Sequence, residues 1–139
     1  MDWKKEAFIL LSRLVAIPSI NPGDKRNYSS EFGEKEIGDS LIDYIQKNMP
    51  YMKVKKLEVL PNRYNIIASY HRGEKYPTIL LTTHLDTVDI QGMKIEPFRL
   101  IENAGKWYGR GATDAKGQIV AMLIGIQKAF LDEDGKLPL

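Results

Sequence analysis

Hydrophobic positions recur at helical spacing in three stretches of the chain. The first covers residues 3–16, with Asp2 placed to cap its opening turn. The second runs from about residue 30 to 48 and stops before Pro50, and the third, the most apolar, covers about residues 115–131. The predicted core stripe of the third helix consists of Ile119, Met122, Leu123, Ile126 and Phe130.

Five other stretches have the composition of strands. Residues 54–60 and 64–70 predict two strands around a short turn. Residues 78–83 form a continuous β-rich run, which is typical of a strand covered on both faces. Residues 98–101 and 106–108 predict a hairpin. Helices before and after strands indicate an α/β layered domain.

Composition narrows the class of protein. A chain of 139 residues has the size of one domain and shows no repeat or linker. It has no apolar run near the roughly 18 residues of a membrane span, and its N-terminus is charged rather than apolar. The net charge of +2 does not indicate a nucleic-acid partner. Cysteine is absent, so a transition metal would need histidine and carboxylate ligands, and a cytoplasmic location fits.

The last residues have the pattern of an approach to a further strand. Asp134-Gly135 is a turn signal, and Lys136-Leu137-Pro138-Leu139 follows it. A domain ending here would leave its sheet unfinished, with an exposed edge. We therefore expect a fragment of a larger domain.

His84 and Asp86 directly follow the run at residues 78–83. Open α/β sheets bind ligands at the carboxyl ends of their strands. In extended backbone these two side chains point to the same side. A metal-bound imidazole usually donates its other N–H to a carboxylate, so His-x-Asp fits a ligand and its supporting residue. On these residues alone, a strand-end histidine bonded to a nearby carboxylate is the favoured reading, and a metal ligand is the alternative.

A glycine-rich loop precedes the third helix and contains Asp114. Gly109, Gly111 and Gly117 allow tight backbone turns close to a ligand. Asp114 is therefore either a helix cap or a metal ligand. Phosphate binding is a third reading. The Walker pattern is absent, because Trp107 follows Gly105-Lys106, and this makes a nucleotide site the weakest reading.

The two motifs together resemble the M20 metallopeptidase family, the group of aminoacylase, acetylornithine deacetylase and succinyl-diaminopimelate desuccinylase. The resemblance rests on Ile66-Ile67-Ala68, His84-Leu85-Asp86-Thr87-Val88, Pro97-Phe98 and Gly109-Arg110-Gly111-Ala112-Thr113-Asp114-Ala115-Lys116-Gly117 in this order. It covers nearly the whole chain, including Ile17-Pro18-Ser19.

The resemblance implies an incomplete three-layer mixed-sheet sandwich of a zinc-exopeptidase-like catalytic domain. Residues 1–139 would be its N-terminal part, without the C-terminal half or the lid and dimerisation domain. His84 would ligate one zinc, Asp114 would bridge two zincs, and Asp86 would be the catalytic residue that clamps the imidazole. A cis peptide bond is expected at 114–115. Gly109, Arg110, Gly111, Lys116 and Gly117 would form the supporting loop.

The implied activity is hydrolysis of amide bonds in N-acyl amino acids or small peptides, with two zinc ions or cobalt in their place. The full-length protein could form a homodimer. The general base and the remaining ligands lie outside this sequence, which contains no Glu-Glu pair, and His71 falls in an exposed turn. The alternative is a catalytically silent module with weak or no metal binding. We therefore expect the chain alone to be inactive.

Overall fold

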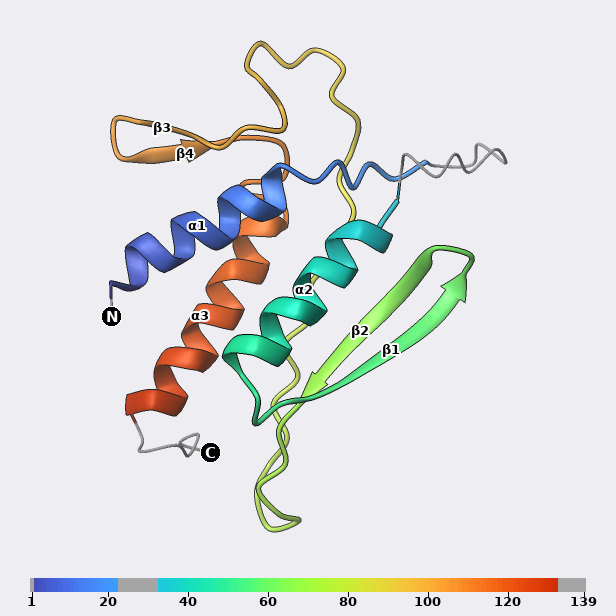
Figure 1. Cartoon of the computed structure of the whole chain (residues 1–139), viewed down its shortest axis with the longest axis vertical. Coiled ribbons are helices and arrows are strands. Elements are labelled where there is room, and N and C mark those ends of the chain that lie inside the picture. The colour runs from blue at the N-terminus through green and yellow to red at the C-terminus, as the bar shows by residue number, and fades with distance from the viewer. Residues whose placement is uncertain (1, 23–32, 133–139) are drawn as a thin grey trace.

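The computed structural model describes residues 2–22 and 33–132. In the described residues two helices come first, four strands follow and a third helix comes last, and this mixed α/β arrangement confirms the predicted class. In order, the elements are α1 (Trp3–Val15), α2 (Lys35–Asn48), β1 (Lys53–Leu60), β2 (Arg63–Ser69), β3 (Ile101–Asn103), β4 (Lys106–Tyr108) and α3 (Lys116–Asp132). Figure 1 shows α1 lying beside α3, with the β1–β2 hairpin along α2.

Helix α1 begins where the sequence predicts. The Asp2 carboxylate accepts a hydrogen bond from Lys5 N, and so satisfies one of the free N–H groups of the first turn. Helix α1 packs on α3, and its buried face belongs to the apolar core that residues of α2 also line. Its buried residues are Leu10, Leu11, Leu14 and Val15.

Tyr64 makes a central contact between helix α2 and the β1–β2 hairpin. The Tyr64 hydroxyl donates to the carbonyl oxygen of Lys35 and to the Asp39 carboxylate. Its ring lies against Gly38, where an added Cβ would come within 2.7 Å of it. The antiparallel hairpin was predicted, and so was the end of α2, whereas the first residues of the predicted second helix lie outside the described residues.

The predicted strand at residues 78–83 is wrong as a description of this structure. The segment has no strand assignment, and all six of its residues are exposed. A strand covered on both faces needs neighbours on its edges and faces, and none of the described elements supplies a ladder to this segment. A few residues after this segment, Thr87 forms an isolated parallel bridge with Ile20.

Two predictions at the C-terminal end need smaller corrections. The first strand of the short hairpin is β3, at Ile101–Asn103, rather than residues 98–101. Helix α3 was predicted almost to its ends, but its buried stripe differs from the prediction. Met122, Ile126 and Phe130 are only half-buried, because α3 turns toward α1 the face that carries Ile119, Val120, Leu123 and Ile124.

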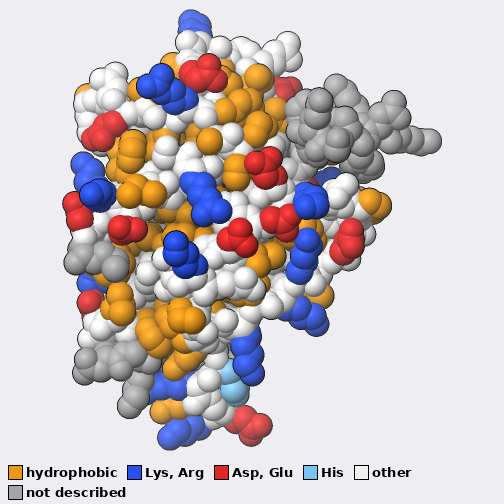
Figure 2. Space-filling model, in the orientation of Figure 1, with side chains coloured by type: hydrophobic (Ala, Val, Ile, Leu, Met, Phe, Trp, Pro, Cys, Tyr) orange, Lys and Arg blue, Asp and Glu red, His pale blue; other side chains and the backbone are white. Residues whose placement is uncertain are grey.

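The surface mixes charge of both signs. On the face in Figure 2, basic and acidic side chains alternate around small apolar areas. Among the described residues, no helix is both long enough and apolar enough to cross a membrane.

Candidate metal centre

His84 directly follows residues 78–83, and both of its ring nitrogens make polar contacts. Its Nδ1 is 2.9 Å from the carbonyl oxygen of Asp86 and 3.1 Å from Asp86 Oδ1. Its Nε2 is 2.9 Å from Asp114 Oδ1. The structure therefore brings together the three residues from two motifs that the sequence separates by about thirty positions.

The two carboxylates differ in how much water they contact. The Asp86 side chain is 28% exposed and the Asp114 side chain 78%, with His84 between them at 49%. The Nε2 side of the imidazole thus faces solvent together with Asp114, whereas Asp86 supports the ring from the protein side. This is the arrangement expected of a ligand and its supporting carboxylate.

The imidazole is biased toward its charged form. The hydrogen bond to Asp114 raises the pKa of His84 above its usual value, and the Asp86 carbonyl and charge add to this effect, against the opposing effect of burial. An imidazole between two carboxylates gains a favourable interaction when protonated. A cation bound at Nε2 would replace that proton.

The glycine-rich loop has the tight geometry that its composition predicts. Gly111 has φ +79°, in the left-handed region, and a Cβ there would lie 2.8 Å from Thr87 Cγ2. A Cβ on Gly117 would lie 2.1 Å from the carbonyl oxygen of Ala112. The peptide bond between Asp114 and Ala115 is cis, as the family resemblance implies.

Lys116, from the predicted supporting loop, lies inside the protein. It is 1% exposed, and its Nζ donates to the carbonyl oxygen of Ile17 at 2.7 Å. Burial, with a lesser effect of the Arg110 charge, lowers the pKa of Lys116 to about 8. Lys116 therefore joins the start of α3 to the segment that follows α1. Arg110 is half-buried and is anchored by a backbone hydrogen bond to Pro97.

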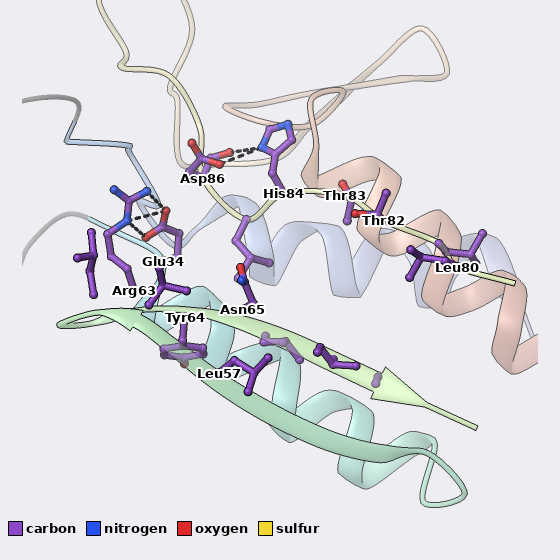
Figure 3. A pocket seen from close by; sticks show the side chains of 17 residues that line it. Glu34, Leu57, Arg63, Tyr64, Asn65, Leu80, Thr82, Thr83, His84 and Asp86 are labelled. Carbon is purple, nitrogen blue, oxygen red and sulfur yellow. Dashed lines mark hydrogen bonds and ion pairs between the residues drawn. The ribbon is translucent and has the colours of Figure 1, made fainter. Parts of the chain in front are cut away.

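Two hollows meet at His84. A pocket of about 250 Å³ is lined by His84, Asp86, Arg110 and Asp114, together with other residues of both loops. A larger groove of about 780 Å³ lies between the β1–β2 hairpin and residues 80–86. Figure 3 shows His84 and Asp86 at one end of this groove, where a second pair, Glu34 and Arg63, is joined by an ion pair.

The residues present fit part of a metal centre rather than a complete one. Imidazole nitrogen and carboxylate oxygen are suitable donors for zinc. Only His84 Nε2 and Asp114 converge, because Asp86 occupies the other ring nitrogen. Within residues 2–22 and 33–132, no group of three or more His, Cys, Asp or Glu side chains could hold a metal ion.

Sequence reasoning missed the residues that hold the His84 loop in place. Ser19 Oγ donates to the carbonyl oxygen of Leu85 at 2.8 Å, and Asn21 Nδ2 donates to Asp86 Oδ2 at 2.7 Å. Both come from the polar segment after α1, more than sixty residues away in sequence. This segment contains Pro18 and Pro22 and has no hydrophobic period, so its local sequence gives no sign of these partners.

Comparison with known proteins finds a family match that includes both motifs. Residues 80–138 match the family model described as Peptidase family M20/M25/M40. The resemblance to M20 hydrolases that the two motifs carry is thereby confirmed.

Individual relatives point the same way. Over 90 residues the chain is 39% identical to a probable succinyl-diaminopimelate desuccinylase of Staphylococcus aureus strain Mu50, a match that covers 63% of this chain and 22% of the relative. Over 110 residues it is 31% identical to an acetylornithine deacetylase of Pasteurella multocida, covering 78% of this chain and 28% of the relative. The chain thus spans well under a third of the length of these relatives.

A solved structure supports the fold over almost the whole chain. The crystal structure of human carnosine dipeptidase 1 superposes with a TM-score of 0.79 at 26% sequence identity, covering 98% of this chain and 30% of that one. The superposition therefore supports the α/β class, and it shows that this chain corresponds to part of the fold of that protein.

Proposed function

We propose that this chain contributes part of the active site of a zinc-dependent amide hydrolase that acts on N-acyl amino acids or small peptides. The observation that carries the proposal is the contact of His84 with Asp114 on one ring nitrogen and with Asp86 on the other. The names of the relatives, a desuccinylase, a deacetylase and a dipeptidase, support the substrate class.

Each of the three residues has a distinct proposed role. Asp86 accepts the Nδ1 proton of His84, so that the unprotonated Nε2 becomes the donor to the metal. Asp114 would supply a carboxylate oxygen to the metal from the loop before α3. Bound zinc would supply Lewis acidity toward an amide carbonyl and toward water.

The supporting loop shapes the solvent-facing pocket. Gly109, Gly111 and Gly117 allow the close backbone contacts, and Arg110 lines the pocket beside Asp114. The hydrogen bond from Lys116 to Ile17 O joins the start of α3 to the segment that follows α1. The general base is not among the residues assigned here, and the cytoplasmic location, the homodimer and the use of cobalt stay predictions.

The alternative of a catalytically silent module shares one expectation with this proposal. Because two converging donors hold zinc weakly, the 139-residue chain should not turn over an N-acetyl amino acid, with or without added zinc. Turnover measured as free amino acid release would contradict this expectation. Absence of turnover together with zinc contact at His84 and Asp114 would favour a partial active site over a silent module.

Zinc binding by histidine variants tests the proposal. In a titration followed by NMR, zinc should shift the signals of His84 and of the loop around Asp114. His84→Ala should weaken binding at least about tenfold, because it removes one of the two donors. His71→Ala is the matched control, since this other histidine is exposed and lines neither of the two hollows that meet at His84. Equal zinc affinity of His84→Ala and wild type would refute the assignment.

A further inference from the structure

The segment that follows α1, residues 17–21, touches both loops of the candidate metal centre. The backbone N–H of Thr87 donates to Ser19 O at 2.8 Å, and the N–H of Asn21 donates to Thr87 O at 2.8 Å. These bonds form the short parallel bridge on which the His84 loop is anchored. Ser19, which is fully buried, adds a side-chain hydrogen bond to Leu85 O.

The other end of the same segment is fixed to α3. Lys116 lies two residues after Asp114 in the sequence. Its buried ammonium group donates a hydrogen bond to Ile17 O at 2.7 Å. Residues 17–21 therefore connect the loop that carries His84 to the helix start that follows Asp114. The distance between the two candidate ligands depends on this connection as well as on their own contact.

Asn21 is the one residue of the segment whose side chain reaches the candidate centre. Its Nδ2 donates to Asp86 Oδ2 at 2.7 Å, while Asp86 Oδ1 is 3.1 Å from His84 Nδ1. The terminal torsion of an aspartate is broad, so one contact does not fix the carboxylate plane. With a second donor on the other oxygen, the plane is fixed and Oδ1 stays directed at the imidazole.

We propose that Asn21 is a positioning residue of this centre, which acts through Asp86 to orient the His84 ring. The consequence for zinc rests on the proposed function, whereas the orientation of Asp86 and His84 does not. The side chain of Asn21 is exposed, so its removal leaves the apolar core unchanged.

A double-mutant cycle on the 139-residue chain tests whether Asn21 acts through Asp86. Asn21→Ala should weaken zinc binding about threefold to tenfold, less than the 10–100-fold typical of a carboxylate that directly supports a ligand. The same substitution in an Asp86→Ala background should change zinc affinity no further. A loss of equal size in both backgrounds, or no loss in either, would overturn the proposal.

Two further variants separate the hydrogen bond from shape and surface effects. Asn21→Asp keeps the size of the side chain but replaces the donor with a second carboxylate, so it should bind zinc no better than Asn21→Ala. Asn103→Ala removes an exposed asparagine from the β3–β4 hairpin and should match wild type. Wild-type affinity in Asn21→Asp would show that the donor is not needed and would contradict the proposal.

A metal-free measurement distinguishes failure of this inference from failure of the proposed function. Nitrogen-15 NMR of the imidazole, at a pH where His84 is neutral, reports the fraction that carries its proton on Nδ1. That fraction should fall in Asn21→Ala and stay unchanged in Asn103→Ala. If wild type shows no zinc contact but this fraction falls, the positioning role stands and the zinc site does not. An unchanged fraction in Asn21→Ala overturns the positioning role, whatever zinc does.

Discussion

Asp39 receives donors from its own helix α2 and from both strands of the β1–β2 hairpin, and so links the helix to the hairpin. Lys35 Nζ lies 2.7 Å from its Oδ2 and Lys56 Nζ 3.3 Å from its Oδ1, and the Tyr64 hydroxyl also donates to it. The hydrogen bonds from Lys35 and then Tyr64 lower the pKa of Asp39 to about 2, from the ordinary 3.8, against an opposing effect of burial. The folded state therefore favours the ionised form.

This environment predicts a specific pH dependence of stability. Because the pKa of Asp39 is lower in the folded state, its contribution is present above pH 3.8 and is lost as the pH falls toward about 2. Asp39→Asn should lower the free energy of unfolding at neutral pH and flatten its decline across that acid range, measured by urea denaturation. Asp43→Asn, an exposed carboxylate on the same helix, should keep the wild-type slope. An identical slope in Asp39→Asn and wild type would contradict the assignment.

The candidate centre was predictable at the residue scale only where a motif carried it. His84, Asp86 and Asp114 stand in short segments whose order and spacing indicate metal chemistry, and the structure brings them together. Asn21 makes its contact 65 residues away, between two polar side chains with no periodic pattern. Such a contact depends on how α1 and α3 pack, so local sequence could not reveal it.

At the scale of single elements, helix and strand differ in how far sequence determines them. A helix closes its hydrogen bonds within itself, so Asp2 and the apolar period predicted α1 almost exactly to its bounds. A strand depends on a partner for its hydrogen bonds. The hairpin β1–β2 carries its partner in the next residues and was predicted, whereas residues 78–83 have no paired neighbour among the described strands. The buried stripe of α3 was misassigned because tertiary packing against α1, rather than the local sequence, decides which face of the helix is buried.

Two glycines of α3 give a matched prediction at this scale. A Cβ at Gly117 would lie 2.1 Å from the backbone oxygen of Ala112, so Gly117→Ala should destabilise the chain by about 1–3 kcal/mol through the shift it forces. At Gly125, nothing in the described structure lies within 4 Å of an added Cβ, so Gly125→Ala should stabilise the helix by about 0.5–1 kcal/mol. Thermal or urea unfolding measures both. Equal effects of the two substitutions would show that α3 does not start against Ala112 as described.

At the scale of the whole molecule, the apolar core and the candidate centre occupy different regions. The core lies among the three helices, with β2 packed on α2, and holds the fold without residues 78–83. The groove between the hairpin and residues 80–86 is open, and Ile79, Leu80 and Leu81 are exposed beside it. Consecutive exposed apolar residues in extended backbone favour pairing with another chain. The part of the fold that sequence could not place correctly is therefore also the part most able to associate.

Leu80 provides the test of that association. It is 84% exposed, so Leu80→Lys should leave the free energy of unfolding within about 0.5 kcal/mol of wild type. The same substitution should reduce concentration-dependent self-association, measured by sedimentation velocity, because a charge disfavours pairing along an open edge. Val88→Lys adds the same charge at another exposed apolar residue, outside the 79–81 run, and should reduce association less. If both variants associate as wild type does, residues 79–81 do not form the contact, and the prediction is wrong.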